Sequence, residues 1–577
     1  MPNASKNFKI IPIALHFAIG LCFLYNIYAL FFPIRTTLES DGAEHLHAAY
    51  LLSVGERPYL DFIQNHPMLF HHFLVWAEKF FDIASSRDLA MVARIIIFGH
   101  FLLSLAIFCL WTTRLIGTRP RGMTWAAFLL ITWAMLDIYN PGFHWMWDIR
   151  PDFICYGQTL LGLYLIHLRI ERSDKGPNPK NLLWAAVGGS LVGFGNAIIL
   201  KGIPFIAAFV LTQVTIALKD DRAKFYSLMN FRNLRKSFII GASAVFSFCA
   251  WVAVDCYLSK VQVGKWVSAV ILLNSRKHFI FSNAGTNPIA AILEPFSVSL
   301  PLALVLVGWI IWELLNSENS ARLKNSCLPV WLFSIFTILI NIILPAYSNG
   351  VTWSYYFIPS VFAAAAICLV LVLRLWQIYR LRPFARPFSI SQVAVVLIAG
   401  FIAVKIVNTP MYAISQWSAR QTAAKEVEAA SPDDFGIEER LPKDFVYLGY
   451  PDQTPIKSRN WNYYFMLARS TDFWRDCYIL GLGPDPQQAW GKGFGDNPPD
   501  AIAFTQRGEL SRFVFFVREC QHIDISWLFD EVRENYVLMG TRGASLYVRK
   551  DRVSHLKSQG WRILASSKTG LLPFDPT

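Results

Sequence analysis

The chain has 577 residues and a net charge of +13, and 54% of its residues are hydrophobic while only 16% are charged. Because an ordinary soluble domain is roughly 25% charged, a wholly water-soluble protein is excluded. Disordered, collagen-like and disulfide-scaffold chains are excluded too, since the chain is apolar and has nine Cys in its whole length.

The sequence predicts an α-helical polytopic membrane protein with about eleven membrane-spanning helices, because a helix needs about 20 mostly apolar residues to cross a bilayer. The run at 153–168 is short, and only Lys201 separates the run at 182–200 from the run at 202–218. The predicted spans begin near Ile10, Ile95, Gly122, Phe153, Leu182, Gly202, Ser237, Pro295, Leu328, Val351 and Phe388.

The distribution of Lys and Arg predicts a cytoplasmic N-terminus. In that orientation the basic clusters at 6–9, 114–121, 169–180, 219–236, 322–324 and 374–386 fall in cytoplasmic connections, as the positive-inside rule requires. An odd number of spans then places everything after about Lys405 outside. The basic character is therefore a topology signal, and no nucleic-acid-binding motif accompanies it.

We expect a membrane domain over 1–407, with outer loops at 35–88, 140–152 and 259–294, and a soluble extracytoplasmic domain over 408–577. The third outer loop contains an apolar stretch, Trp266–Leu273, that fits a short helix lying along the membrane interface.

The C-terminal region reads as a small α/β or α+β domain. Strand character is found at 445–448, 501–504, 512–517 and 536–539, a hairpin closes over 544–548, and helices fit 414–430 and 527–534. Cys477 and Cys520 are its only cysteines. Both a disulfide and two buried thiols are compatible with them.

The first outer loop concentrates ionisable side chains directly after a predicted span. Ser40 or Asp41 can cap a helix over 43–54 that ends at Gly55. Acids and histidines at a membrane surface can deprotonate a hydroxyl or hold a divalent metal, whereas an acidic cap with a purely structural role is the alternative. The candidate residues of this loop are Asp41, Glu44, His45, His47, Arg57, Tyr59, Asp61 and His66.

A second cluster, with Asp148, Arg150 and Asp152, precedes the run at 153. Arg150 can hold phosphate, since a guanidinium matches phosphate oxygens, or it can simply pair with a neighbouring Asp. Lys201 is either a second phosphate cation or a lysine whose ammonium reaches the interface. Tyr355 fits a sugar contact or an aromatic belt.

Several common sites are missing from the sequence. There is no Walker loop, no supported dinucleotide fingerprint and no HExxH motif, so nothing indicates binding of a soluble nucleotide. Gly189 and Gly193 are typical of close helix packing in membranes.

The loop residues resemble those of a known family. Asp41-Gly42-Ala43-Glu44-His45-Leu46-His47, with the run from Gly55 to Phe62 and His66-Pro67, is similar to the first loop of bacterial membrane glycosyltransferases with the C-type fold. The group in question is related to protein O-mannosyltransferases and lipid A aminoarabinose transferases. Ile149-Arg150-Pro151-Asp152 resembles its second-loop motif, and 498–502 and 536–550 resemble its outer tail. The chain departs from the pattern at Gly42 and Gln64, where many relatives carry acids.

The resemblance implies a glycosyltransferase of a bacterial inner (plasma) membrane, with its C-terminal domain in the periplasm. It would move a hexosyl or pentosyl group, with inversion, from a polyprenyl-phosphate donor to a lipid, glycan or protein acceptor. Asp41 would be the general base, with Glu44 beside it, and Arg150 and Lys201 would bind the donor phosphate. Sugar or acceptor contacts would come from His45, His47, Arg57, Tyr59, Asp61, His66, Asp148, Asp152 and Tyr355.

Two further questions are left open by the sequence. No cofactor is certain, and a divalent metal, Mg²⁺ or Mn²⁺, would have Asp41, Glu44, Asp148 or Asp152 as its ligands. The alternative functions are a transporter or flippase of lipid-linked sugars and a non-catalytic envelope assembly protein. Transporters place ionisable groups near mid-membrane on broken helices, often in repeated halves. Here the charges cluster at one surface and no repeat is found, which favours the transferase.

Overall fold

The computed structural model describes the parts of the chain that follow, and all structural statements refer to them. They are residues 40–115, 148–171, 179–220, 231–275, 329–341, 358–363, 365–367, 415, 418, 441–449, 455–460, 477–483, 485–503, 509–521, 523–541 and 544–564.

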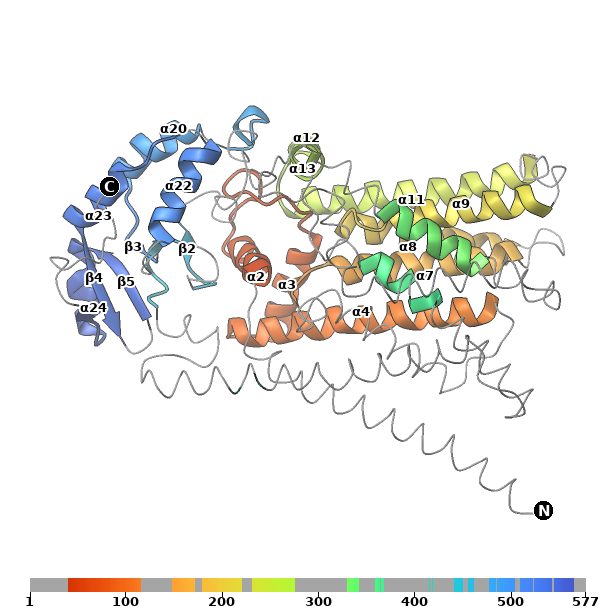
Figure 1. The fold of residues 1–577 in the computed structure, drawn as a ribbon, viewed down its shortest axis with the longest axis horizontal. Coiled ribbons are helices and arrows are strands. Elements are labelled where there is room, and N and C mark those ends of the chain that lie inside the picture. The colour runs from red at the N-terminus through yellow and green to blue at the C-terminus, as the bar shows by residue number, and fades with distance from the viewer. Residues whose placement is uncertain are drawn as a thin grey trace, which may run out of the picture.

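Long helices run side by side along one half of the molecule (Figure 1). Three of them are long and apolar enough to cross a membrane, by length and composition, within Ser86–Arg114, Lys180–Ile198 and Ser237–Leu258. Shorter apolar helices occupy Pro329–Asn341 and Ile358–Ile367. The long helices are α4 (Ser86–Leu115), α7 (Asp152–Glu171), α8 (Pro179–Ile198), α9 (Ile203–Asp220) and α11 (Phe231–Leu258).

These helices coincide with seven of the predicted spans, and Lys201 does separate two helices, because α8 ends at Ile198 and α9 begins at Ile203. The predicted spans near Ile10, Gly122, Pro295 and Phe388 lie outside the described residues, as does the predicted helix over 414–430 apart from two of its residues. The total of eleven therefore stays a prediction.

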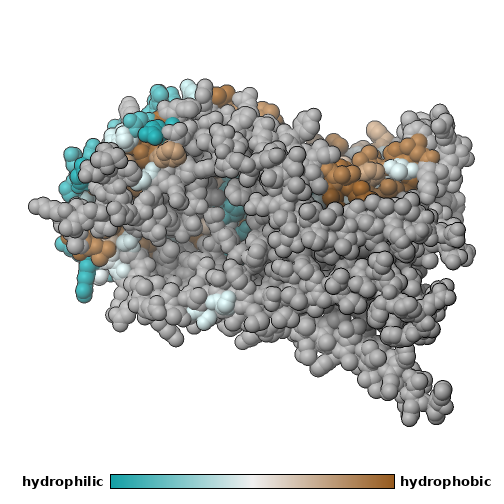
Figure 2. Space-filling view, in the orientation of Figure 1, coloured by the Kyte–Doolittle hydropathy of each residue, from teal (hydrophilic) through white to brown (hydrophobic). Residues whose placement is uncertain are grey.

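Helix α11 turns large apolar side chains outward. Phe238, Phe246 and Tyr257 are between 74% and 82% exposed, and brown side chains gather along this helix while teal ones lie over the C-terminal elements (Figure 2). Water disfavours so large an apolar surface, so this face is suited to lipid.

The opposite face of α11 packs tightly on α8 through glycines. A Cβ atom at Gly189 would lie 2.6 Å from the Ile240 carbonyl oxygen, and one at Gly193 would lie 2.8 Å from the Phe248 nitrogen. Only glycine allows the two backbones to approach so closely, which confirms the packing role predicted for both residues.

Shorter helices lie between the long helices and the C-terminal elements (Figure 1). Helix α2 begins three residues before the predicted start, so Asp41 lies within its first turn. The helix predicted near Trp266 is present, and Trp266 is 1% exposed. These elements are α2 (Ser40–Ser53), α3 (Leu69–Phe80), α12 (Val263–Val267), the π-helical turn η2 (Ser268–Leu272) and α13 (Leu273–Ser275).

The C-terminal region contains a six-stranded mixed sheet in the order β2-β1-β3-β5-β4-β6. Strand β1 pairs in parallel with β2 and β3, whereas the pairs β3–β5, β5–β4 and β4–β6 are antiparallel. The strands are β1 (Val446–Leu448), β2 (Arg459–Asn460), β3 (Ala501–Ile502), β4 (Tyr536–Thr541), β5 (Ala544–Arg549) and β6 (Arg562–Ile563). The accompanying helices are α20 (Pro486–Gln488), η6 (Ala489–Gly493), α21 (Phe494–Asp496), α22 (Glu509–Gln521), α23 (Trp527–Asn535), η7 (Lys550–Arg552) and α24 (Val553–Ser558).

The prediction of a strand over 512–517 was wrong, because these residues belong to helix α22. Leu510, Phe513, Val514 and Val517 recur at intervals of three and four residues and are all buried. That spacing forms one face of a helix, and burying the face outweighs the strand preference of Phe and Val. Cys477 is buried, but the Cys520 side chain is outside the description, so their pairing stays open.

The C-terminal region packs against the first outer loop. One apolar cluster contains Tyr59 and Met68 from the loop, Trp266 from α12, and Trp490 and Phe513 from the C-terminal region. Contacts of this kind hold the first loop between the long helices and the sheet, and this placement fixes the orientation of α2.

Candidate functional site

Four charged side chains from three separate parts of the chain form a network of alternating charge. Arg150 Nη1 donates to Asp41 Oδ2, and Arg150 Nε donates to Asp152 Oδ2 at 3.2 Å. Lys201 Nζ donates to the other oxygen of Asp152. The order along the network is therefore carboxylate, cation, carboxylate, cation: Asp41, Arg150, Asp152 and Lys201.

The network is open to solvent at one end and closed at the other. The Asp41 side chain is 39% exposed, whereas those of Arg150 and Asp152 are 7% and 3% exposed. Removing one partner of a buried pair costs about 3–5 kcal/mol. Asp41 is therefore the accessible end of the network, and Asp152 is its buried centre.

Helix N-termini meet at this network. Asp41 lies in the first turn of α2, Asp152 is the first residue of α7, and Lys201 stands two residues before α9. The N-terminal end of a helix carries a partial positive charge. The partial positive charge of these helix ends adds to the charges of Arg150 and Lys201, and together they make the site suitable for an anion.

The turn that carries Lys201 is fastened to α7. Asn196 Oδ1 accepts the Gly202 N–H at 3.2 Å, and Asn196 Nδ2 donates to Thr159 Oγ1 at 3.3 Å. A Cβ atom at Gly202 would lie 2.6 Å from that Thr159 oxygen. Lys201 is thus held beside Asp152 and forms a part-buried ion pair with it. This contact matches neither a bare phosphate cation nor a lysine whose ammonium simply reaches the interface.

A pair of neutral histidines lies next to the charges. His45, one helical turn after Asp41, shares a hydrogen bond of 2.9 Å between its Nδ1 and Nε2 of His71. Burial, together with the positive charge of Arg150, lowers the pKa of His45 to about 3, and burial also lowers the pKa of His71 well below its ordinary value. The His66 ring lies 5.5 Å from that of His45. The sequence analysis missed His71, although the adjacent pair at 71–72 was a usable signal.

Other predicted site residues of the first loop engage partners away from this network. His47 Nδ1 donates to the Ile456 carbonyl oxygen at 2.8 Å. Arg57 and Asp61 pair with each other through two bonds of 2.9 Å at an exposed position. Tyr59, at a φ of +64°, donates its hydroxyl to the His66 carbonyl oxygen. His47, Arg57, Tyr59 and Asp61 therefore shape the loop in this conformation.

Three further predicted residues are Glu44, Asp148 and Tyr355, of which the structure describes the first two. Glu44 is half-buried on α2, on the turn between Asp41 and His47. Asp148 is buried, and its carbonyl oxygen accepts the Arg150 N–H at 2.8 Å, which orients the segment before α7. Tyr355 lies outside the described residues.

Asp255, which the sequence analysis missed, fastens the first loop to α11. Its Oδ2 accepts the Met68 N–H at 3.0 Å and the Trp266 Nε1–H at 2.8 Å, and the residue is fully buried. His72 Nε2 shares a hydrogen bond of 2.8 Å with Ser259 Oγ, which itself donates to Asp255 Oδ1 at 3.4 Å. An ionisable residue inside a predicted span is itself a signal of special use, and it could have been found.

The donor set does not fit a metal ion. Both Asp41 and Asp152 accept hydrogen bonds from cations. Across the segments that the structure describes, no three His, Cys, Asp or Glu side chains are grouped so that they could hold a metal. Asp41, Glu44, Asp148 and Asp152, which were predicted as possible metal ligands, are therefore not assigned a metal-binding role.

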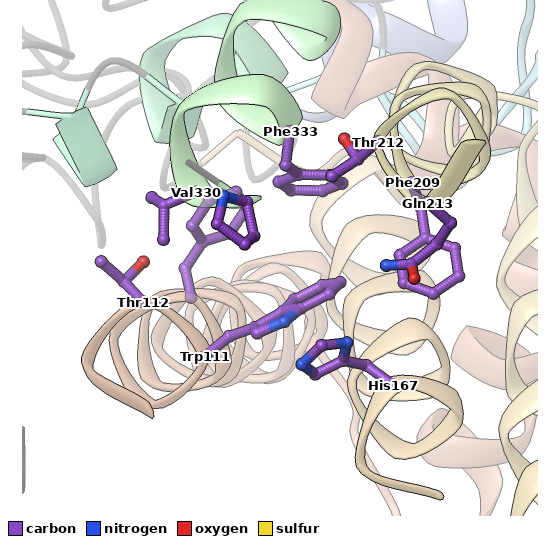
Figure 3. Close-up of a pocket in the computed structure, with 10 residues that line it drawn as sticks. Trp111, Thr112, His167, Phe209, Thr212, Gln213, Val330 and Phe333 are labelled. Carbon is purple, nitrogen blue, oxygen red and sulfur yellow. The ribbon is translucent and has the colours of Figure 1, made fainter. Parts of the chain in front are cut away.

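A separate cavity lies between α4, α7, α9 and the helix over Pro329–Asn341, and Figure 3 shows side chains that line it. It is small, with a volume of about 20 Å³, and its lining includes Trp111, Phe209 and Phe333, with His167 beside Trp111. His167 is near the last turn of α7 while Asp152 is its first residue, a separation of about 22 Å along the axis. The cavity is therefore not part of the charged network.

No family model matches the chain, and no curated protein matches it. Similar solved structures do exist. The crystal structure of ArnT from Cupriavidus metallidurans bound to undecaprenyl phosphate has a TM-score of 0.47 at 13% identity, covering 85% of this chain and 92% of that one.

The Archaeoglobus fulgidus oligosaccharyltransferase is similar in two crystal structures, one a complex with Zn and sulfate and one tethered to an acceptor peptide containing the NVT sequon. Their TM-scores are 0.44 and 0.45 at 12% identity, covering 92% and 93% of this chain and 73% and 74% of theirs. ArnT and this oligosaccharyltransferase both have the C-type glycosyltransferase fold, the class that the sequence resemblance names.

Proposed function

We propose that the protein is a membrane glycosyltransferase that moves a sugar from a polyprenyl-phosphate donor to a hydroxyl of a lipid, glycan or protein acceptor. The observation that carries this proposal is the charged network, in which an accessible carboxylate, Asp41, stands beside two cations, Arg150 and Lys201. A base next to a phosphate-binding pair is what transfer from a phosphate-linked sugar requires.

The reaction has one bond-forming and one bond-breaking event at the anomeric carbon. The acceptor oxygen attacks this carbon from the face opposite the phosphate, and the bond from the carbon to the phosphate oxygen breaks with inversion. The hydroxyl proton passes to the Asp41 carboxylate, as in general base catalysis. The electron pair leaves with the phosphate, which gains one negative charge.

Arg150 and Lys201 oppose that developing charge. Positioned cations in a site that excludes water stabilise a transition state strongly, because they need no rearrangement when the charge appears. Asp152 contacts both cations and keeps them side by side. No proton donor for the leaving phosphate is needed, which fits the neutral state of His45.

The remaining candidates are proposed to surround the sugar and acceptor. Glu44 is half-buried on the same helix as Asp41 and would orient the acceptor rather than act as base. The His45 and His66 rings lie 5.5 Å from each other, with His45 on the turn after Asp41, and Asp148 lies in the segment that leads to Arg150. Figure 1 places these elements at the end of the long helices that faces the C-terminal region.

The proposed setting is a bacterial inner membrane with eleven spans and the site on the periplasmic side. Support comes from the Lys and Arg distribution along the chain. A site on that side receives a lipid-linked sugar without needing a cytosolic nucleotide sugar.

The test is release of polyprenyl phosphate by purified protein in detergent or nanodiscs, supplied with a radiolabelled polyprenyl-phosphate sugar and an envelope extract as acceptor source. We expect polyprenyl phosphate to accumulate together with labelled acceptor, both with a chelator and with added Mg²⁺ or Mn²⁺. Movement of intact donor across a vesicle membrane without release would instead indicate a flippase, and no reaction of either kind would contradict the proposal. Mass spectrometry of envelope glycans from a deletion strain would identify the sugar and the acceptor.

A further inference from the structure

We propose that Asp41 occupies the phosphate site of the protein until the donor arrives, and that the donor phosphate frees this base by taking its place on Arg150. This inference rests on the proposed function, and it concerns how the same site is activated.

The first step is the geometry of Arg150. Its guanidinium donates through Nη1 to Asp41 and through Nε to Asp152. A carboxylate and a phosphate both accept charge-assisted hydrogen bonds from a guanidinium, and Asp41 accepts one through a single oxygen. Asp41 is thus an internal substitute for the anion that Arg150 is suited to bind.

The second step is which carboxylate a ligand can displace. Asp152 is 3% exposed and also bonded to Lys201, whereas Asp41 is 39% exposed. The Asp41 carboxylate reaches solvent within a part-buried pair, while separating Asp152 from its two cations would leave buried charges without partners. An incoming phosphate therefore replaces Asp41 and leaves Asp152 in place.

The third step is the consequence for catalysis. While Asp41 is paired with Arg150, its Oδ2 accepts a hydrogen bond from a cation and is a poor acceptor for a hydroxyl proton. Once phosphate holds Arg150, the like charge of the phosphate repels the carboxylate, which stays on the helical turn shared with His45. The base becomes available only when the group that it must help to displace is bound, and donor binding precedes activation of the acceptor.

The closing experiment measures binding rather than turnover. A short-chain polyprenyl phosphate is titrated into purified protein by calorimetry, and the polyprenol of the same length serves as the phosphate-free control ligand. Exchange predicts that Asp41→Asn binds the phosphate more tightly than wild type, with a Kd lower by about three- to tenfold, although the same change abolishes the proposed base.

The matched control is Asp82→Asn. Asp82 is exposed in the turn after α3, and its φ of +51° suits Asn as well as Asp. The substitution Asp82→Asn removes one negative charge from the same outer loop without touching Arg150. The Kd for polyprenyl phosphate should therefore stay at the wild-type value. An equal gain in Asp82→Asn would mean that net charge alone is responsible and would overturn the exchange.

A double-mutant cycle separates exchange from simple repulsion. In protein that already carries Arg150→Gln, the substitution Asp41→Asn should produce little of the gain in phosphate affinity that it produces alone. The reason is that Arg150 is no longer there to be released from its ion pair. An undiminished gain in that background, or an unchanged or weaker affinity in Asp41→Asn alone, overturns the proposal. Asp41→Ser, which also suits a helix start, replaces Asn if melting temperatures show that Asn disturbs the fold.

The outcomes also separate this inference from the proposed function. If wild-type protein binds neither polyprenyl phosphate nor its sugar-linked form, the glycosyltransferase proposal fails. If wild type binds the phosphate and transfers sugar, but Asp41→Asn gains no affinity, only the exchange fails.

Discussion

Arg150 forms an ion pair with Asp41, a residue 109 positions earlier in the chain. The pair joins the start of α2 to the segment that leads into α7. It brings the proposed base into contact with the proposed phosphate cation, so each affects how the other behaves.

Replacing Asp41 with Asn should reduce sugar transfer by about 10²–10⁴-fold, because the acceptor hydroxyl loses its positioned base. The amide keeps the shape of the side chain and Asn suits a helix start, so stability should change little. The measurement is turnover with a polyprenyl-phosphate sugar, alongside the melting temperature of the purified variant.

Glu44→Gln is the companion variant, and it should be milder if Glu44 only orients the acceptor. Near-wild-type turnover in Asp41→Asn would remove Asp41 as the base. Severe loss confined to Glu44→Gln would move that role to Glu44.

Replacing Asp152 with Ala should destabilise the protein by about 3–5 kcal/mol, because it leaves Arg150 and Lys201 together in a buried site without their shared carboxylate. Asp61→Ala is the matched control. It breaks the exposed pair with Arg57 and should cost about 1 kcal/mol or less. Chemical denaturation in detergent compares the two variants, and equal losses would show that Asp152 is not the buried centre.

Acid should destabilise the protein partly through His47. Burial lowers the pKa of His47 from 6.5 to about 4, so between these values the unfolded chain binds a proton that the folded protein does not. The contribution of His47 to the free energy of unfolding is therefore greatest above pH 6.5. It falls by about 1.4 kcal/mol per pH unit as the pH drops from 6.5 toward 4.

The variant His47→Gln keeps a donor for the Ile456 carbonyl oxygen but cannot take up the proton. Its stability should therefore fall less steeply than that of wild type over the same pH window, as followed by thermal unfolding. Parallel curves for the two proteins would show that His47 does not titrate in this way.

Replacing Gly193 with Ala should separate α8 from α11. The added Cβ would lie 2.8 Å from the Phe248 nitrogen and 3.0 Å from the Ser247 Cβ, and backbone atoms cannot move aside without shifting a helix. Overpacking of this kind costs about 1–3 kcal/mol. Gly241→Ala is the control, since a Cβ there meets nothing within 4 Å, and it should be neutral or stabilising by up to about 1 kcal/mol. Similar melting temperatures for both variants would count against this packing.

The C-terminus should lie outside the cytoplasm, because the basic clusters of the chain favour a cytoplasmic N-terminus and an odd number of spans. A C-terminal alkaline phosphatase fusion should be active, and a fluorescent-protein fusion should be dark. The reverse pattern would mean an even number of spans or the opposite orientation.

The sequence by itself determined the features that depend on local pattern. Apolar length predicted spans from near Ile95, Leu182 and Ser237, which fall within α4, α8 and α11, and Lys201 marked the break between α8 and α9. The hairpin predicted to close over 544–548 is confirmed by the antiparallel pairing of β4 with β5. These features are readable because hydrophobic length and turn residues act on neighbours in the chain. The strand predicted at 512–517 failed where aromatic strand preference competed with helical spacing and the buried core decided.

Only the tertiary structure decided which charges meet. Asp41, Arg150, Asp152 and Lys201 were each candidates in the sequence, but their order in the network and the exposure of Asp41 arise from the packing of α2, α7 and the turn before α9. The partners of His71 and Asp255 across the fold were likewise decided by the tertiary structure, although the sequence did offer a signal for each residue. The physical reason is that an ion pair depends on separation in space, and no pattern along the chain records the distance between residues more than a hundred positions apart.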